Sequence, residues 1–364
     1  MPDEKNAVAV EKSEKPTTET TKESPKKGSK KILMTVVTAV VAAIVLVIVG
    51  VGIYIYVGGY KIPWVNAIAR VVPYPVAVVD GHIVRLSDFS ANMEIAQHNI
   101  LAQKQVDIFD STNKQYRDLV EQGVLASQIE GEVIVRLTKK YDVSVTQADI
   151  QKEEDSLLTQ FKDKADFEKT IQDLFGISVA DFEKQILLNQ VAKQKLQKYY
   201  LDNRDLTKTE RDKASEVVDK LKKGEKFDEL AKKYSDDSSA TQGGDLGTVA
   251  RGTYDAEFEK AALALKVGET SGIVQTQFGW HVIQLVAKDD KSLHAKHILV
   301  QSKFEDWLIA EVKKANIFLL ANAFQWDKSA GELKLATEGT VSDTPAGDAS
   351  TNTTNSTGTT NTTK

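Results

Sequence analysis

An uncharged apolar run near the N-terminus is the feature that most constrains this chain. Residues 32–57 read ILMTVVTAVVAAIVLVIVGVGIYIYV, which is 26 residues without a charged side chain. A helix of that length, at 1.5 Å per residue, spans the roughly 30 Å of bilayer hydrocarbon. A cleavable signal peptide would have an apolar region of about 7 to 15 residues and then a small-residue cleavage site. The run has neither feature, so we predict a transmembrane helix.

The flanks of this run set its orientation. Lys26, Lys27, Lys30 and Lys31 precede it, whereas Gly-Gly-Tyr-Lys and then Trp64 follow it. Positive residues stay on the cytoplasmic side of a membrane. We therefore expect a single-pass protein of the cell membrane, with a cytoplasmic N-terminus and the bulk of the chain outside the cytoplasm.

Composition excludes several classes of function. The 364 residues carry 47 Lys plus Arg and 52 Asp plus Glu, a net charge of -5, so no excess of positive charge attracts nucleic acid. The absence of cysteine excludes thiol catalysis, thiolate zinc sites and disulfides. Residues 1–31 and 339–364 are polar and have few large apolar side chains, which predicts that both ends are disordered.

Helical patterns follow a predicted hairpin. Residues 76–79 and 82–85 flank Asp80-Gly81, a dipeptide typical of a tight β-turn. We expect a helix capped by Ser87 that ends near Gln105, and a long amphipathic helix over 114–141. Further signals are helix starts at Thr146 with Asp149 and at Ser178 with Asp181, and a helix stop at Gly176.

This region, with its segments VSVTQADIQKEEDSL, DFEKTIQDLFGIS and ADFEKQILLNQVAKQKL, resembles the chaperone module of the bacterial folding factors SurA, PrsA and PpiD. The resemblance implies apolar clefts that hold unfolded polypeptide. The alternative is a helical bundle that serves only as a spacer.

A second resemblance begins after a charged amphipathic helix over 210–223. In order, YSDDSSA, GGDLG, FEKAALAL, VGE and FGWHVIQL resemble parvulin peptidyl-prolyl isomerases over about 80 residues. The fold class implied is α+β: a helical SurA-like module with an inserted parvulin domain, whose four-stranded antiparallel sheet is surrounded by helices. Parvulins open with a histidine-bearing strand such as HILV, which is missing here. Instead HAKHILVQSK stands at 294–303, which suggests a circularly permuted parvulin, or else the start of a truncated second copy.

Strand geometry tests the permutation. The strands HVIQLVA and HAKHILV are joined by KDDKSL, a segment that can turn a hairpin. A turn centred on Asp289 would place His281 directly opposite His297, with their Cβ atoms about 4.5 to 5.5 Å apart. A hydrogen-bonded core pair is the alternative to a catalytic pair. His294 and His297 lie on opposite faces of a strand and cannot chelate a metal together, and no cysteine or obvious acidic ligand completes a site. We expect no metal and no cofactor.

The parvulin resemblance also implies roles for individual residues. It assigns His281, His297 and Asp237 to catalysis, although Asp237 also fits a simple turn residue. The side chains implied for the proline pocket, each of which also fits a core position, are Leu246, Tyr254 and Phe258, with Thr276 and Phe278 at its edge.

Helix 304–315 and the segment 316–321 resemble the C-terminal element of SurA-like chaperones, and we expect 316–321 to pair with the hairpin at 76–85. The expected divisions are 1–31 (cytoplasmic tail), 32–57 (membrane helix), 58–75 (linker), 76–204 (chaperone module), 205–303 (permuted parvulin), 304–338 (returning helix and strand) and 339–364 (tail).

The predicted function is a membrane-anchored folding factor that isomerises X-Pro bonds in unfolded secreted polypeptides. The alternatives are an inactive holdase, which uses the parvulin fold only to bind peptide, and a membrane scaffold. The partners expected are unfolded proline-containing chains and the bilayer, and not nucleic acid.

Overall fold

Strands from distant parts of the chain form a small sheet in the computed structural model, which describes residues 72–320 and 323–336. Its order is β2 (His82–Arg85), β1 (Pro75–Val79) and β7 (Ile317–Leu319), with both pairs antiparallel. Asp80 and Gly81 turn the hairpin at φ 48° and 85°. The predicted pairing of 316–321 with the hairpin is confirmed, because Ala77 faces Leu319.

The carboxylate of Asp80 ties this sheet together. The backbone N–H of Asn316 donates to Oδ1 of Asp80 over 2.8 Å, and Arg136 forms an ion pair with the same carboxylate. Because Arg136 lies on α4 (Lys114–Lys140), the Asp80 side chain joins the hairpin, the residue before β7 and this helix.

Helices form the rest of this part of the chain. They are α3 (Leu86–Lys104), α4, α5 (Gln147–Leu158), α6 (Lys164–Phe175), α7 (Val179–Phe182), α8 (Leu188–Asp202) and α12 (Phe304–Lys314), with a π-helical turn over Glu183–Leu187 and a 3₁₀ turn over Ser111–Asn113. Thr146 and Asp149 form a full capping box, Ser178 caps α7, and Gly176 ends α6 at φ 72°. These three predictions are confirmed.

The expected cap at Ser87 is wrong. Helix α3 begins at Leu86, with Arg85 at the N-cap position. Leu86 is fully buried and its N–H donates to the carbonyl of Tyr74 over 2.7 Å. A backbone partner thus satisfies the helix start and Ser87 falls into the first turn.

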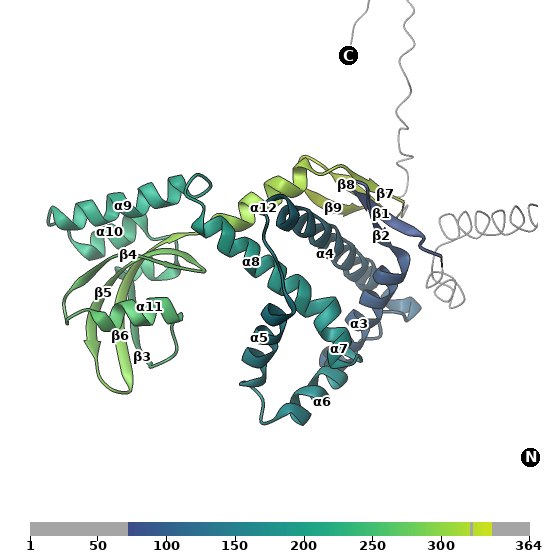
Figure 1. The fold of residues 1–364 in the computed structure, drawn as a ribbon, viewed down its shortest axis with the longest axis horizontal. Helices are drawn as coiled ribbons and strands as arrows, with labels where there is room; N and C mark the ends of the chain where they lie inside the picture. The colour runs from purple at the N-terminus through teal and green to yellow at the C-terminus, as the bar shows by residue number, and fades with distance from the viewer. Residues whose placement is uncertain (1–71, 321–322, 337–364) are drawn as a thin grey trace, which may run out of the picture. The chain divides into compact units, whose positions relative to one another are not determined.

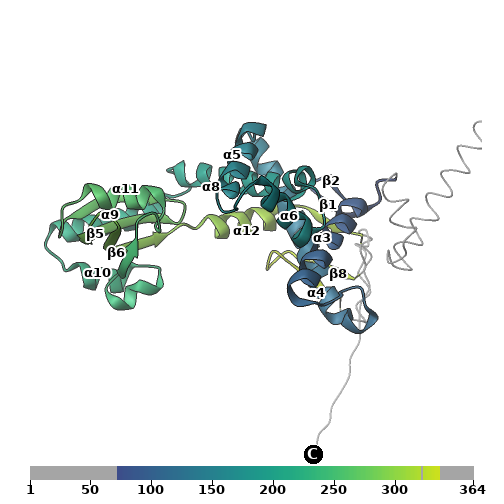
Figure 2. The ribbon, with the colours of Figure 1, turned by 90° about the horizontal axis from the view of Figure 1, so that it is seen from below.

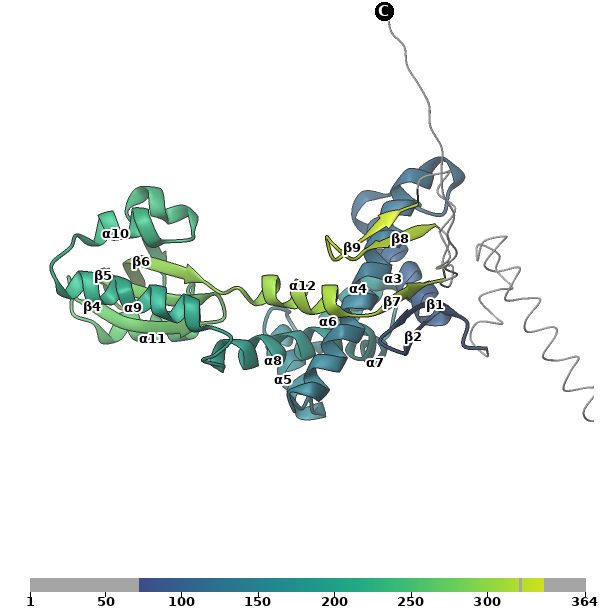
Figure 3. The ribbon, with the colours of Figure 1, turned by 90° about the horizontal axis from the view of Figure 1, so that it is seen from above.

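Four of these helices form a cluster, and a second hairpin packs on α4. Helices α5, α6 and α8 lie together (Figure 2), and with α7 they share an apolar core around Phe167, Phe182 and Leu187. The hairpin β8 (Phe324–Asp327) and β9 (Glu332–Leu335) lies beside α4, and the side chain of Gln122 donates to the carbonyl of Leu333 (Figure 3). This hairpin was not predicted from the sequence.

Residues 245–301 form the predicted four-stranded antiparallel sheet. Its order is β3 (Asp245–Ala250), β6 (Ser292–Gln301), β5 (Gly279–Lys288) and β4 (Thr270–Thr276). Helices α9 (Lys208–Lys222) and α10 (Phe227–Tyr234) cover one face, and α11 (Ala256–Ala264) covers the other (Figure 1). A 3₁₀ turn, Ser238–Gln242, leads into β3.

Alternation along β5 and β6 divides the core between the two faces. Val282 and Ile298 pack against α9 and α10, whereas Ile283, Leu285 and Ala295 pack under α11. His281 and His297 have the same parity as the second set, so both histidines lie on the α11 face.

The expected register of the two strands is wrong. His281 faces Leu299, and His297 faces Ile283. The turn runs from Asp289 to Ser292 rather than centring on Asp289, because the Asp289 carboxylate accepts hydrogen bonds from the N–H groups of Lys291 and Ser292. A bulge between Leu285 and Ala287 shifts the pairing further. The histidines are therefore diagonal neighbours on one face.

No helix within residues 72–320 and 323–336 has both the length and the hydrophobicity to cross a membrane. The predicted span over 32–57 and the two polar ends lie outside the described residues.

Candidate active site

Two imidazoles meet at the centre of the α11 face of the sheet. Nδ1 of His281 lies 3.1 Å from Nδ1 of His297, and the ring centroids are 5.3 Å apart. The side chains are buried, with exposed fractions of 4% and 7%. Because one Nδ1 must donate and the other accept, the contact requires at least one neutral ring.

An aromatic ring closes the other side of this pair. Phe258, on α11, meets His281 edge-on at 5.3 Å and His297 at 5.8 Å, and its own exposure is 3%. Tyr254 packs on Phe258 at 4.9 Å, and Leu246 adds to the same apolar cluster. The pair thus faces an apolar surface on the α11 side.

Thr276 holds the far nitrogen of His281. Its Oγ1 lies 2.8 Å from Nε2 of His281 and also accepts the backbone N–H of Phe278 over 3.1 Å. With its oxygen accepting from Phe278, the Thr276 hydroxyl is free to donate to the imidazole. Thr276 is buried, whereas the Phe278 side chain is exposed beside it.

Asp237 lies at the other end of the histidine pair. Oδ2 of Asp237 is 3.1 Å from Nε2 of His297, although the direction of the ring N–H does not meet hydrogen-bond geometry. Ser235 donates its hydroxyl to the carboxylate, and the N–H of Ser239 donates over 3.0 Å. Asp237 is therefore both a helix cap and a neighbour of the imidazole.

The loop that carries Asp237 is attached to β6. The N–H of Leu299 donates to Oγ of Ser235 over 2.9 Å, and the N–H of Asp236 donates to the carbonyl of Leu299 over 2.8 Å. Because β3 pairs with β6 only as far as Lys296, the rest of this edge of β6 is open to the loop.

Gly244 fixes the backbone of His297. The N–H of His297 donates to the carbonyl of Gly244 over 2.8 Å, and Gly244 has φ 80°. A Cβ at Gly244 would lie 2.1 Å from the carbonyl oxygen of His297, far inside van der Waals contact. Only glycine fits here, so the motif GGDLG lets two backbone segments approach closely and is not a phosphate-binding loop.

Burial determines the charge of the site. Desolvation, followed by the nearby His297, lowers the pKa of His281 to about 3, although Asp237 acts in the opposite direction. Burial alone would raise the pKa of Asp237, but hydrogen bonds from Ser235 and Ser239 and the contact with His297 outweigh it, so this pKa is lowered. At neutral pH the site therefore holds a neutral His281 and an ionised Asp237.

These charges give the contacts one direction. A carboxylate beside Nε2 of His297 favours the tautomer with a proton on that nitrogen, which leaves Nδ1 of a neutral His297 as an acceptor. His281 then donates from Nδ1 and accepts from Thr276 at Nε2. We assign the tautomers from these partners.

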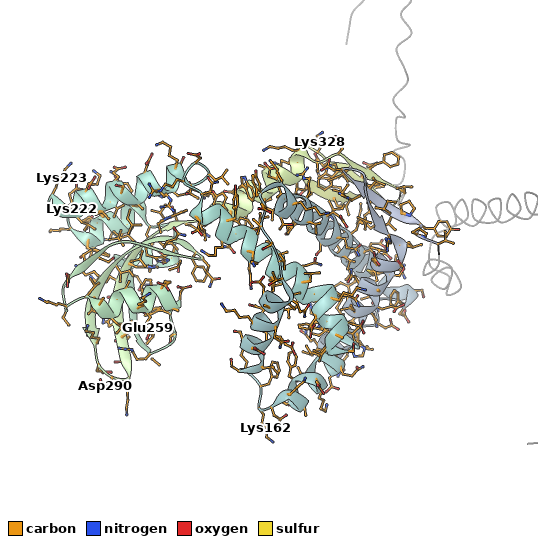
Figure 4. All side chains as sticks on the ribbon, in the orientation of Figure 1. Lys162, Lys222, Lys223, Glu259, Asp290 and Lys328 are labelled. Carbon is orange, nitrogen blue, oxygen red and sulfur yellow. The ribbon has the colours of Figure 1, made fainter. Side chains whose placement is uncertain are left out.

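The structure brings the predicted site residues together. His281, His297, Asp237, Thr276 and Phe258 are in direct contact as described, and three others, Leu246, Tyr254 and Phe278, surround them. Burial raises the pKa of Tyr254, and the nearby Asp245 and Glu259, the latter labelled in Figure 4, add to the effect. The hydroxyl of Tyr254 is buried without a hydrogen-bond partner within the described residues.

Other residues of the site escaped sequence reasoning. Ser235, Ser239 and the carbonyl of Gly244 hold Asp237 and His297 in place, and only the motifs YSDDSSA and GGDLG pointed to them. His294 does not join the pair, since its Nε2 lies 2.7 Å from Oδ1 of Asp245. Across the described ranges, no three potential ligands cluster as a metal site would require.

The pKa of His281 predicts a pH dependence of stability. An unfolded histidine titrates near 6.5, so stability from the neutral ring is complete above that pH and is lost as the pH falls toward 3. We expect wild type to lose about 1.4 kcal/mol per pH unit in this window relative to His281→Asn. Urea denaturation of both chains at several pH values measures this, with His82→Asn, at an exposed position, as control. Parallel curves for wild type and His281→Asn would contradict the assignment.

Comparison with known proteins identifies the family. The family model for the PPIC-type PPIase domain (Rotamase) matches residues 191–287, a segment that ends before β6. Foldase protein PrsA of Caldanaerobacter subterraneus subsp. tengcongensis is 31% identical over 225 residues, covering 57% of this chain and 72% of that protein. Foldase protein PrsA 2 of Bacillus anthracis is 33% identical over 228 residues, covering 56% and 78%.

Among solved structures, peptidylprolyl isomerase (PrsA) from Bacillus anthracis is 25% identical, with coverage of 52% of this chain and 96% of that chain and a TM-score of 0.22. The similarity to PrsA proteins spans over two thirds of their length at more than 30% identity, so this chain belongs to the PrsA foldase family and is a parvulin-type peptidyl-prolyl isomerase.

Proposed function

We propose that this protein is a membrane-anchored extracytoplasmic folding factor that isomerises X-Pro bonds and binds unfolded, proline-containing secreted chains. The observation that carries the assignment of its active site is the contact between His281 and His297 beside Phe258. His281, His297 and Asp237 are the proposed catalytic residues.

The chemistry needs no nucleophile. Rotation about the amide meets a barrier of about 18 to 20 kcal/mol because it breaks resonance, and the twisted amide is less polar than either planar isomer. A desolvated site therefore favours the twisted state, which is how a catalyst lowers the barrier. The burial of His281 and its lowered pKa fit this role, since an imidazolium would instead favour the polar planar amide.

Apolar side chains supply the proposed binding site for the proline ring. Leu246 and Tyr254 are partly buried on the cluster that contains Phe258, so they offer apolar surface beside the histidines. Thr276 contacts His281, and the backbone N–H of Phe278 donates to Thr276. The exposed ring of Phe278 is the proposed contact for the residues that flank proline.

The order of strands supports the proposal of a circular permutation. Strand β6 supplies His297 and lies between β3 and β5, yet it follows both in the chain. The match to the PPIC-type domain ends at residue 287, before this strand. We therefore propose that 292–301 is the displaced first strand of a parvulin and completes the domain, rather than starting a second copy.

The proposed domain division follows from these elements. A chaperone module over 76–204 and 304–338 brackets the permuted parvulin at 205–303, which is supported by the pairing of β7 with β1. A tail at 1–31, a linker at 58–75 and a tail at 339–364 complete the division.

The apolar run at 32–57 supports membrane anchoring with an extracytoplasmic catalytic part. Alkaline carbonate extraction of membranes tests the anchor, since an integral protein stays in the pellet. Release of the full chain into the supernatant would refute it.

Single substitutions test the proposed site. We expect His281→Ala and His297→Ala each to lower kcat/KM for a proline-containing peptide by about tenfold or more, equivalent to about 1.4 kcal/mol of transition-state stabilisation. Asp237→Asn should have a smaller effect, because it keeps an oxygen near His297. His98→Ala, remote from the site in α3, is the control. A protease-coupled isomerisation assay of the full chain gives these values.

The pattern of results distinguishes the alternatives. Loss of activity in His297→Ala supports a site completed by β6. Activity retained in both histidine variants would refute the assignment of the site. Aggregation of an unfolded client, measured on the same samples, separates loss of isomerisation from loss of chaperoning.

Gly244 offers a test of the backbone that positions His297. Gly244→Ala should lower kcat/KM by at least tenfold, because its methyl group meets the carbonyl of His297 at 2.1 Å. Gly247→Ala is the matched control, since Gly247 has a similar φ of 70° but its Cβ would meet nothing within 4 Å. Equal effects of the two variants on activity would show that backbone strain, rather than the contact with His297, matters.

A further inference from the structure

A groove separate from the isomerase site lies between α4, α12 and the β8–β9 hairpin. It encloses about 490 Å³. Its floor is buried, with Ile129, Leu308 and Leu333 each no more than 2% exposed. Leu119 and Ile309, which also line it, are 54% and 45% exposed. The groove therefore continues outward as an open apolar surface.

The hairpin contributes an aromatic side chain to this groove. Trp326 lines it, and the indole Nε1 of Trp326 is buried with no hydrogen-bond partner within the described residues. The ring of Trp326 therefore adds aromatic surface to the lining, while its N–H stays inside the protein. The turn of this hairpin is marked by Lys328 in Figure 4.

The ionisable side chains that line the groove are all acidic. They are Glu130, Glu305 and Glu332. The side chains of Glu305 and Glu332 are 64% and 57% exposed. Lys193 bridges Glu130 and Glu305, and Lys334 pairs with Glu332, but neither lysine belongs to the lining. The carbon stem of Lys313 lies where a Cβ at Gly331 would stand.

We propose that this groove binds an extended apolar segment of an unfolded client that is flanked by Lys or Arg. The inference rests on the proposed chaperone function and specifies its substrate class. Apolar residues of the segment occupy the floor and pack against the ring of Trp326, and the flanking cations meet the exposed carboxylates of Glu305 and Glu332.

Labelled peptides test the proposal. Three fluorescein-labelled, proline-free 12-residue peptides share one core of Leu, Ile and Val and carry paired Lys, Gln or Glu at both ends. Fluorescence anisotropy with the full-length chain in detergent micelles gives their Kd values. We expect the Lys-flanked peptide to bind at least tenfold more tightly than the Glu-flanked peptide, with the Gln-flanked peptide between them.

Two variants locate the binding. Gly123 lines the groove and its Cβ would meet nothing within 4 Å, so Gly123→Leu fills the groove without a backbone clash. This variant should raise the Kd of the Lys-flanked peptide at least tenfold. Gly131→Leu, on the same helix and equally open at Cβ, is outside the lining and is the control. The double variant Glu305→Lys, Glu332→Lys should reverse the order of the peptides, and Glu229→Lys should not.

Several results would overturn the proposal. Equal Kd values for the three peptides, or unchanged binding in Gly123→Leu, would each refute it. A dimer of this chain that Gly123→Leu abolishes would make a second copy the occupant. If the peptides bind only after residues 60–71 are replaced by Gly and Ser, that segment occupies the groove instead. Isomerase activity and suppression of client aggregation, measured on the wild-type chain, show whether the proposed function fails as well or only the groove.

Discussion

The backbone pairing of β6 is the constraint on which the active site depends. One edge of the strand pairs along its whole length with β5, which brings His297 beside His281. The other edge pairs with β3 only at its start, and then accepts Gly244 and the loop around Ser235. The neighbours of His297 therefore come from three separate segments, each held by hydrogen bonds to one strand.

This arrangement explains why the imidazoles are held so closely without a metal ligand set among the described residues. Burial under Phe258 keeps His281 neutral, and a chain of contacts from Thr276 to Asp237 orients both rings. The ionised Asp237 is tolerated because hydroxyl and backbone donors surround it. A polar network thus crosses an otherwise apolar core, from Thr276 to the ionised Asp237.

Local signals predicted much of this fold. The Asp80-Gly81 turn, the capping box at Thr146 and the stop at Gly176 all act through neighbouring residues, so they can be read from sequence. The register of β5 and β6 could not be derived, because a bulge near Ala287 and the carboxylate of Asp289 set it. The cap at Ser87 failed since a distant carbonyl, that of Tyr74, satisfied the helix start.

The site residues show the same difference between local signals and long-range contacts. The motifs pointed to His281, His297 and Asp237, but their mutual distances depend on how a late strand enters the sheet. The β8–β9 hairpin was missed, although Asp327 and Gly331 form its turn, because its strands are short and are stabilised by packing on α4.

The pairing of β1 with β7 has a consequence for the order of folding during synthesis. All strands of the isomerase sheet lie within residues 245–301, whereas β1 and β2 gain their third strand only when residues 317–319 emerge. All strands of the isomerase sheet are therefore synthesised while the β1–β2 hairpin still has an unpaired edge. In a nascent chain this edge is open to pairing with other chains until residues 317–319 are available.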